Sequence, residues 1–405
     1  MTVKVLHAIT DLDLGGAETM LLRLLEAGTP GKFAPAVLSL MNPDDAQNGT
    51  VAPQIAALGV TISSLDMRRR RPTPQHVWQL CRTVRTIAPD LLQGWMYHGN
   101  LAATVGGWSL PRRPPVIWNV RHSVHDLALE KPLTRLIIRL SARLSRLPRA
   151  IIYNSRVSAA QHQGLGFDAE RAVVIPNGFD TVRFRPRPDA RSRLCKELGI
   201  DPARIVVGMI ARDHPMKDPG NLVRAIGLLR AGGHDVHLVI IGRGMDRTHT
   251  DLVALVRELE LGACVTLVGE RRDVPDLCPG FDIAALPSAW GEGFPNVLGE
   301  AMASGVPCVA TDVGDCTWVI GPHGLIVPPQ QSEALANALA RLIDLGVDAR
   351  QQLGRAARAR VLQHFSIQEI VRQYEALHLQ VSTEPAVRQP WQHGEMAGVR
   401  HRRPA

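Results

Sequence analysis

Aromatic residues and long apolar runs are both scarce in this chain of 405 residues. Aromatic residues make up only 4% of the chain, which argues against a single-stranded nucleic-acid-binding protein, because such proteins stack bases on aromatic side chains. No run reaches the roughly 18 apolar residues that suggest a membrane-spanning helix. The first residues also lack the apolar core of a signal peptide, so we expect a cytoplasmic protein.

Closely spaced cysteine pairs are absent as well. The six cysteines are scattered without a CxxC motif, and we expect reduced thiols, with Cys264 and Cys308 in the core. Asp11 and Asp13 resemble a metal-binding DxD sequence, but aspartates just before a helix more often act as caps or turn residues. We therefore expect neither a metal ion nor a cofactor.

What the sequence does contain is a regular alternation of short apolar runs and helical patterns. Parallel strands covered by helices on both faces produce this alternation, so it predicts an α/β fold with doubly wound parallel sheets. The chain is too long for one core, and the turn-rich segment Phe179–Asp189 interrupts the pattern. We predict two Rossmann-like domains facing across a cleft, residues 1–180 and 189–365. The helix 368–381 should pack back on the first domain, and residues 382–405 should be a disordered tail.

The apolar runs also give the expected strands. In chain order they are Val3–Ile9, Ala36–Leu40, Thr61–Leu65, Leu91–Trp95, Val116–Val120, Ile151–Asn154, Val173–Ile175, Ile205–Ile210, Val236–Ile241, Val265–Val268, Ile283–Leu286, Cys308–Ala310 and Leu325–Val327. Right-handed crossovers place the carboxyl ends of parallel strands at one edge of a sheet, where ligands of such folds bind.

One stretch, Pro287–Asp312, concentrates the features of a ligand site. The strand that ends at Leu286 leads into a turn with Glu292, and a helix is predicted to open at Pro295 and to carry Glu300. The free amides of a helix N-terminus bind anions, whereas carboxylates accept hydrogen bonds from hydroxyl groups. The stretch therefore suits a ligand that is part diphosphate and part sugar.

Two further groups follow other predicted strands. Gly15 and Gly16 come after the first strand and would let the backbone approach a ligand closely, although a plain strand-to-helix turn would look the same. Their sequence is not GxGxxG, so a dinucleotide is not indicated. Arg212 and Lys217 follow the strand Ile205–Ile210, where two cations suit a leaving diphosphate.

Histidines also lie near strand ends in the first half of the chain. His122 follows the strand Val116–Val120 and could exchange a hydrogen bond with a substrate hydroxyl group. His125 and His98 are the rivals for this role, and a structural role is the alternative for any of the three.

Basic residues form two clusters in a chain with 46 basic and 38 acidic residues. Four arginines recur at helical spacing opposite an apolar face, and Arg68–Arg71 forms the second cluster. Both clusters would suit an anionic membrane surface, whereas the alternative is a scaffold helix with one solvated face. The four arginines are Arg135, Arg139, Arg143 and Arg146, and the apolar face comprises Leu136, Ile137, Leu140, Leu144 and Leu147.

Taken together, these motifs resemble the retaining glycosyltransferases of family 4, which have the GT-B fold. The motifs are DLGGAE (13–18), WNVRHS (118–123), VIPNGFD (174–180), ARDHPMKD (211–218) and, above all, EGFPNVLGEAMASGVPCVATD (292–312). The resemblance covers roughly residues 3–380. This family commonly has glycines where Ala211 and Asp218 stand here, which puts the shape of that loop in question.

The resemblance implies roles for individual residues. Arg212 and Lys217 would grip the donor diphosphate, Glu292 the sugar hydroxyls and Glu300 the ribose, while His122 would lie at the sugar. His122, Arg212, Lys217 and Glu292 would form the catalytic set. The remaining donor contacts would come from Gly16, Arg271 in the segment that passes the base, Gly293, Phe294, Pro295, Asn296 and Val297.

The function implied is retaining, metal-independent transfer from a nucleotide sugar, with a UDP-sugar as the expected donor. The acceptor would be a saccharide or a lipid-linked saccharide in cell-surface polysaccharide or glycoconjugate biosynthesis, with peripheral contact at the inner face of the membrane. A nucleotide-sugar epimerase with the same fold and a non-catalytic sugar-binding protein remain alternatives.

Overall fold

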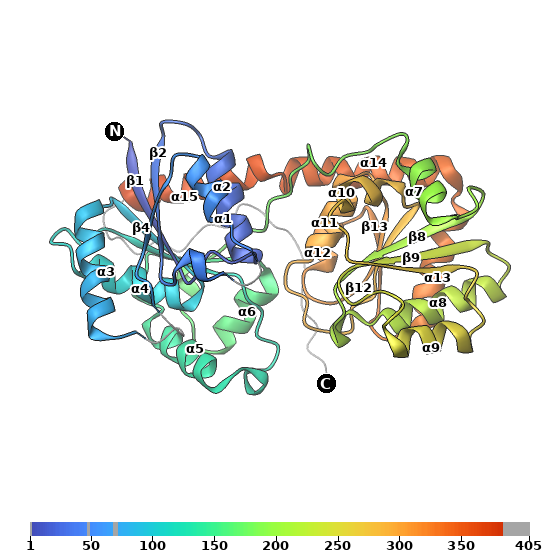
Figure 1. Ribbon diagram of the computed structural model, residues 1–405, viewed down its shortest axis with the longest axis horizontal. Coiled ribbons are helices and arrows are strands. Elements are labelled where there is room, and N and C mark those ends of the chain that lie inside the picture. The colour runs from blue at the N-terminus through green and yellow to red at the C-terminus, as the bar shows by residue number, and fades with distance from the viewer. Residues whose placement is uncertain (1, 47–48, 68–71, 384–405) are drawn as a thin grey trace.

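The computed structural model describes residues 2–46, 49–67 and 72–383, which form two α/β bodies with one parallel sheet each (Figure 1). The seven-stranded sheet has the order β3-β2-β1-β4-β5-β6-β7, and the six-stranded sheet has the order β10-β9-β8-β11-β12-β13. Every strand pair in both sheets is parallel. The predicted α/β fold with two doubly wound sheets is confirmed.

The strands of the first sheet are β1 (Val3–Ile9), β2 (Phe33–Ser39), β3 (Thr61–Ser64), β4 (Leu91–Trp95), β5 (Val116–Val120), β6 (Ala150–Tyr153) and β7 (Ala172–Val174). Those of the second are β8 (Ile205–Ile210), β9 (Val236–Ile241), β10 (Val265–Gly269), β11 (Ile283–Leu286), β12 (Cys308–Thr311) and β13 (Gly324–Val327). Each strand overlaps a predicted apolar run.

The helices are α1 (Gly16–Ala27), α2 (Ala52–Ala57), α3 (Pro74–Ile87), α4 (Met96–Trp108), α5 (Pro132–Leu144), α6 (Arg156–Gly164), α7 (Ala190–Leu198), α8 (Pro219–Ala231), α9 (Thr250–Glu258), α10 (Val274–Leu277), α11 (Asn296–Ala303), α12 (Cys316–Ile320), α13 (Ser332–Asp344), α14 (Gly346–His364) and α15 (Ile367–Thr383). None of the helices in the described ranges is both long and apolar enough to cross a membrane.

Alternate side chains of the strands build separate cores on the two faces of each sheet. In β1, Val5 and Ile9 pack in one core with α1 and α15, whereas Leu6 and Ala8 pack in another with α3 and α4. The second sheet is covered likewise, by α11, α12 and α14 on one face and by α8 and α13 on the other. Burial on both faces explains why the strands are continuous apolar runs in the sequence.

The strand order fixes where ligands of such a sheet bind. The chain order reverses between β1 and β4 in the first sheet and between β8 and β11 in the second. The loops that leave such a pair of strands diverge to opposite faces and leave a crevice at the carboxyl edge of the sheet. The glycine loop follows β1, the basic pair follows β8, and Glu292 follows β11, so all three occupy such positions.

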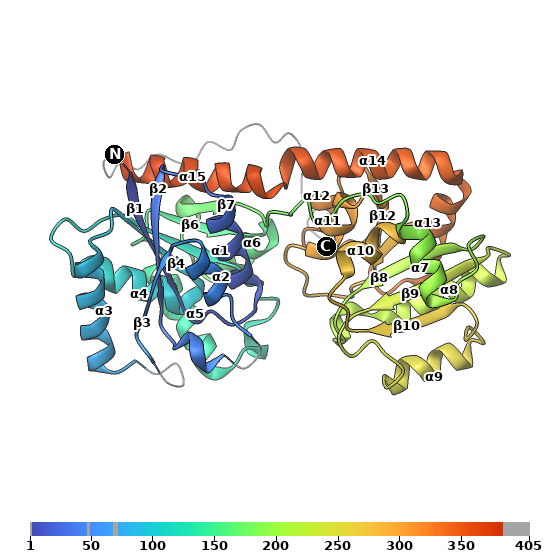
Figure 2. The same cartoon turned by 45° about the horizontal axis from the view of Figure 1, so that its top comes forward.

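The C-terminal helices span both bodies, and Figure 2 shows α14 along the second body and α15 along the first. Tyr374 and Leu377 of α15 are buried in the core of the first sheet, and Glu375 pairs with Lys32 at 2.7 Å. The two crossings of the chain between the bodies run together, because Phe179 donates to the carbonyl of Phe365 at 2.8 Å. The segment expected to be a linker is thus partly core, and Phe179 itself is buried.

Three element boundaries differ from the predictions. The helix expected to open at Pro295 begins at Asn296, with Pro295 as its N-cap residue. Helix α15 continues to Thr383, two residues into the expected tail, while residues 384–405 lie outside the described residues, as do Arg68–Arg71. Helix α5 ends at Leu144, so Arg146 and Leu147 of the predicted amphipathic helix lie beyond its end.

The cysteines fit the core positions expected of them. All six are free, and Cys264 and Cys308 are both buried. Burial raises the pKa of the Cys308 thiol, so it stays protonated and unreactive.

Candidate active site

The centre of the site is a buried ion pair between two residues that are far apart in the sequence. Lys217 Nζ lies 2.5 Å from Glu292 Oε1, and the same oxygen accepts a hydrogen bond from Ser288 Oγ at 2.5 Å. The side chains are 15% and 7% exposed, respectively. In the part of the chain that the structure describes, Oε2 of Glu292 has no hydrogen-bond partner, which leaves it as an acceptor for a ligand hydroxyl group.

The loop after β11 delivers Glu292 and leads into α11. Ala289 donates to the carbonyl of Met216 at 2.8 Å, which ties this loop to the loop that carries Lys217. Phe294 is buried against Phe179 and Trp318, so only its backbone faces a ligand. Asn296 is exposed at the N-terminus of α11, where unpaired amides attract anions.

Glu300 lies one turn into α11 and is half-buried. Burial raises the pKa of Glu300 to about 7, although the positive charges of Arg23 and Arg183 lower it in part. Because Arg23 belongs to α1, the electrostatic environment of this carboxyl extends into the first domain.

The basic loop after β8 has an unusual backbone at the position of the missing glycine. Asp218 has φ +46° and ψ +54°, which is the left-handed region that normally favours glycine. Its side chain also accepts a hydrogen bond from Asn221 and caps α8. Aspartate tolerates this conformation, so the loop keeps the glycine-like backbone. Arg212 is exposed beside this loop, and no carboxylate within the described ranges forms an ion pair with it.

The glycine loop of the first domain ends at α1. A side chain at Gly16 would meet nothing within 4 Å, so the backbone there is open to a ligand. A Cβ atom at Gly15, by contrast, would lie 2.4 Å from Glu18 Oε2, because the Glu18 carboxyl folds back over the N-terminus of the helix. Burial raises the pKa of Glu18 to about 7, and Asp11 reinforces the shift.

Among the three candidate histidines, His122 has both a charged and an aromatic partner. Its Nε2 lies 3.3 Å from Glu130 Oε1, and its side chain is 33% exposed. Its Nδ1 lies 3.4 Å from the hydroxyl of Tyr97. His125 is exposed in the following loop, and His98 is half-buried on α4.

The two domains meet beside the loop of Glu292. Asn177 donates to Asn296 Oδ1 at 2.6 Å. Asp315 accepts from the amide of Arg156 at 2.7 Å, which places its carboxylate at the N-terminus of α6. A Cβ atom at Gly293 would lie 2.5 Å from Ser123 Oγ, so only glycine fits there without a shift.

Arg271, which was expected beside the base, pairs with two carboxylates. Its guanidinium pairs with Asp273 and with Glu197 of α7, each at 2.5 Å. These two carboxylates raise the pKa of the guanidinium.

No group of three potential metal ligands occurs in the described part of the chain. Asp13, expected in a turn or cap, forms an isolated β-bridge with Thr50.

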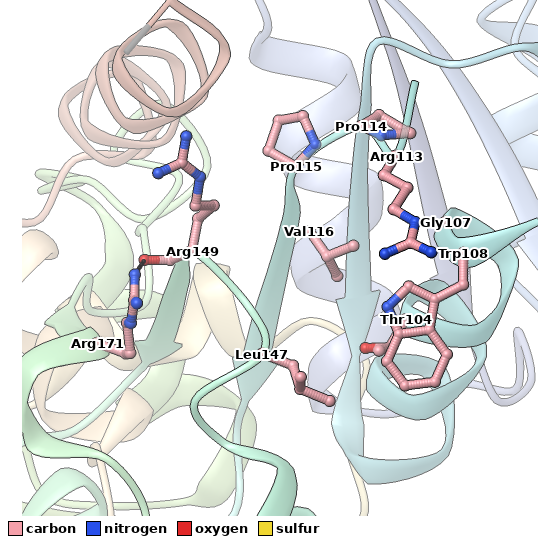
Figure 3. Close-up of a pocket in the computed structure, with 10 residues that line it drawn as sticks. All are labelled: Thr104, Gly107, Trp108, Arg113, Pro114, Pro115, Val116, Leu147, Arg149 and Arg171. Atoms are coloured by element: carbon pink, nitrogen blue, oxygen red, sulfur yellow. Dashed lines mark hydrogen bonds between the residues drawn. The ribbon is translucent and has the colours of Figure 1, made fainter. Parts of the chain in front are cut away.

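Outside the site, the first domain has a cavity of about 350 Å³ at the opposite edge of its sheet, where β5 begins (Figure 3). Arg113 and Trp108 lie on one side of β5 in this view, and Arg149 and Arg171 lie on the other. The guanidinium of Arg171 donates to the carbonyl of Arg149 at 3.4 Å. The four side chains do not converge on one point, so the cavity does not resemble a second active site.

Sequence reasoning assigned no role to several residues at the site. Ser288, Glu130 and Tyr97 act through contacts that cross between elements, and no local pattern predicts such contacts. Asn177 stands in a motif that the sequence displays, VIPNGFD, but its partner Asn296 lies 119 residues away.

Two family models match the chain. "Glycosyltransferase Family 4" matches residues 14–183, and "Glycosyl transferases group 1" matches residues 204–344. The lipopolysaccharide core biosynthesis mannosyltransferase LpsB of Rhizobium meliloti is 29% identical over 67% of this chain and 81% of its own length. The D-inositol 3-phosphate glycosyltransferase of Rhodococcus erythropolis is 32% identical over 48% of this chain. The matched segment covers only 46% of that relative's own length.

Solved structures support the fold. The structure of Anabaena Alr3699/HepE in complex with UDP superposes with a TM-score of 0.76 at 23% identity, covering 93% of this chain and 99% of that one. The structure of WaaG, a glycosyltransferase involved in lipopolysaccharide biosynthesis, superposes with a TM-score of 0.65 at 16% identity. The match covers 93% of this chain and 99% of the WaaG chain.

Proposed function

Because this chain belongs to the family 4 and group 1 glycosyltransferases and has their GT-B fold, we propose that it transfers a sugar from a nucleotide-sugar donor with retention of the anomeric configuration. The observation that carries this proposal is the Lys217–Glu292 pair beside the N-terminus of α11. It brings a cation for phosphate, a carboxylate for sugar hydroxyls and free amides together at one sheet edge.

The leaving group would be the donor diphosphate. Arg212, Lys217 and the amides of α11 would stabilise the negative charge that develops as the sugar–phosphate bond breaks. Arg212 is suited to this role because it is exposed and is not paired with a described carboxylate. Glu300 would accept hydrogen bonds from the ribose hydroxyls in its ionised form.

The first domain would complete the site. Gly16 would lie against the diphosphate or the sugar, since the space beside it is open. His122 would contact the sugar itself. Oε1 of Glu292 is engaged by Lys217 and Ser288, and the proposal assigns Oε2 to a sugar hydroxyl group rather than to covalent attack. We therefore favour a same-face displacement in which the departing phosphate takes the proton of the acceptor hydroxyl.

The proposed donor is a UDP-sugar. A structure with the same fold was determined with UDP and with UDP-glucose, which supports this choice. The proposed acceptor is a saccharide or lipid-linked saccharide of a cell-surface polysaccharide or glycoconjugate, in line with the lipopolysaccharide core named for LpsB. No metal ion takes part in this proposal.

We further propose that the enzyme works in the cytoplasm and touches the inner face of the membrane through α5. The apolar side chains Leu133, Leu136 and Leu140 are 52%, 63% and 41% exposed, although leucines of a scaffold helix would be buried. The buried residues of α5 are instead Ile138, Ser141 and Ala142. An exposed apolar stripe flanked by arginines fits an anionic lipid surface.

A thermal-shift panel of UDP-, GDP- and ADP-sugars tests the proposal. A donor present at 100 times its dissociation constant should raise the unfolding free energy by about 2.7 kcal/mol. No shift with any of them would count against a nucleotide-sugar site. Incubating the stabilising donor without acceptor separates the rivals, because an epimerase would convert it while a transferase would at most hydrolyse it slowly.

A further inference from the structure

A chain of buried hydrogen bonds runs behind His122. Its Nδ1 lies 3.4 Å from Tyr97 Oη, which lies 2.7 Å from Nε2 of His162. Nδ1 of His162 in turn lies 2.8 Å from the backbone carbonyl of Ser158, one turn earlier in α6. Tyr97, His162 and Ser158 are all buried, so the chain connects the half-exposed imidazole of His122 to the interior of the first domain.

The donor and acceptor of each hydrogen bond follow from the backbone carbonyl of Ser158, at the buried end of the chain of hydrogen bonds. A carbonyl only accepts, so Nδ1 of His162 carries the proton. Burial lowers the pKa of His162 to about 4, so the ring is neutral at pH 7 and Nε2 accepts. Tyr97 therefore donates its hydroxyl proton to Nε2, and burial raises the pKa of Tyr97, which keeps that proton in place.

The hydroxyl of Tyr97 has only one proton to donate, and His162 takes it. The oxygen therefore presents lone pairs to Nδ1 of His122, which must donate. The hydroxyl of Ser158 does not interfere, because it donates to the backbone carbonyl of His122 at 2.6 Å.

We propose that Tyr97 and His162 are positioning residues that hold the neutral imidazole of His122 with its proton on Nδ1, so that Nε2 accepts a hydrogen bond from a hydroxyl group of the donor sugar. The proposal rests on the function above only for the identity of that hydroxyl group. The tautomer itself can be measured without a donor in Glu130→Ala, which removes the carboxylate from Nε2 of His122.

Glu130 marks the position of the incoming hydroxyl group. Its Oε1 lies 3.3 Å from Nε2 of His122, and a carboxylate there accepts a hydrogen bond from a proton on Nε2, carried by the charged ring or by the other neutral tautomer. Glu130 therefore opposes the proposed tautomer until the sugar displaces it. A sugar hydroxyl group can donate to the neutral ring, so the sugar would take the place of Glu130.

Nuclear magnetic resonance of protein labelled with ¹⁵N at its 15 histidines tests the tautomer directly. Long-range proton–nitrogen spectra distinguish a protonated from an unprotonated ring nitrogen, and His122→Gln identifies the signals of His122. The spectra are recorded on Glu130→Ala protein, at a pH where the ring is observed to be neutral. We expect Nδ1 to carry the proton in this protein, and a proton on Nε2 there would overturn the proposal.

Added to Glu130→Ala, two variants change the hydrogen-bond chain in opposite ways. Tyr97→Phe removes the acceptor and should abolish the preference for Nδ1. His162→Phe frees the hydroxyl of Tyr97 to donate to Nδ1 of His122 and should move the proton to Nε2. An unchanged tautomer in both folded variants would contradict the proposal.

Tyr153→Phe is the matched control. The ring of Tyr153 also lies beside His162, at 5.4 Å between centroids, but its buried hydroxyl has no hydrogen-bond partner in the described structure. This change should leave the tautomer of His122 and the kinetics as they are.

Donor kinetics separate positioning from a merely structural role. Loss of one hydrogen bond to the sugar in Tyr97→Phe should raise the donor KM about 2- to 10-fold and leave kcat nearly unchanged, because the contact is made before and during the reaction. A smaller folded fraction would instead lower kcat at constant KM, and that result would contradict the positioning role. If no donor is turned over at all, the proposed function fails while the tautomer measurement still stands.

Discussion

The Lys217–Glu292 pair shows how a single contact can serve both stability and chemistry. Both side chains are mostly buried, and each is the main charged partner of the other. A charge buried without its partner is costly, whereas replacing both partners with neutral groups often costs little. Stability and activity should therefore respond differently to single and double substitutions.

We predict that Lys217→Met lowers the unfolding free energy by about 3 kcal/mol, because Glu292 is then left without a cation. The double variant Lys217→Met/Glu292→Gln should recover most of that loss, yet both proteins should be inactive. Urea unfolding and a transfer assay measure the two quantities. Equal stability of Lys217→Met and wild type would show that the pair does not form.

Glu300 gives a prediction for pH. Its pKa in the folded protein is about 7, against an ordinary value of 4.5. Below about pH 4.5 the carboxyl is protonated in both states, whereas between 4.5 and 7 only the folded state keeps the proton. The stability that this group contributes is therefore lost as the pH rises through about 7.

Glu300→Gln should remove that loss, so the stability of the variant relative to wild type should rise between about pH 4.5 and 7. Thermal unfolding across this range measures the difference. Glu18→Gln is a useful comparison, because the pKa of Glu18 is also raised to about 7 and the same trend is expected. A difference that does not depend on pH would contradict the assigned pKa of Glu300.

The residues of the candidate site could be proposed from the sequence because they follow strand ends or stand in a recognisable motif. Arg212, Lys217 and Glu292 all do so. The residues that hold Glu292 and His122 could not be predicted, since Ser288 and Tyr97 are ordinary residues in their local sequences. Their roles depend on contacts between elements, which a single sequence does not encode in any spacing.

At the level of elements, the sequence predicted that helix α5 is amphipathic but not which of its faces is covered. The periodicity of arginines and leucines predicted an amphipathic helix. The covered face depends on how the helix packs on the sheet. In the structure, Leu133 and Leu136 are more than half exposed. The strands, by contrast, were predictable throughout because burial on both faces makes them uniformly apolar.

We predict that the enzyme binds vesicles containing phosphatidylglycerol and that Leu133→Ser/Leu136→Ser weakens this binding at least about tenfold, because two apolar side chains no longer enter the lipid surface. Leu345→Ser/Val347→Ser is the control, since these residues of the second domain are 51% and 59% exposed. Vesicle sedimentation measures both. Equal binding by the two double variants would exclude α5 as the contact.

At the scale of the whole molecule, the domains are joined by more than the two chain crossings. Asp315 of the second domain accepts hydrogen bonds from the amides of Arg156 and Val157 at the N-terminus of α6. The guanidinium of Arg156 also lies 4.1 Å from the ring centre of Trp318. These contacts hold the loop of Glu292 against the first domain and so bring the two halves of the proposed site together.

The two-domain fold could be predicted from chain length and from the interruption after residue 180. The junction could not, because Asp315 looks in the sequence like any residue that precedes a short helix. Its actual partners lie in α6, more than 150 residues earlier. Long-range pairs of this kind are the part of the structure that periodicity and motif spacing do not contain.

The central claim is that the two domains together transfer a sugar from a nucleotide sugar with retention. Proton magnetic resonance of the anomeric signals tests it most directly, with the donor that stabilises the protein and with water or a saccharide as acceptor. For an α-linked donor, we predict that the first product formed carries the sugar in the α configuration. A β-configured first product, or conversion of the nucleotide sugar to its epimer with the sugar–phosphate bond intact, would contradict the account.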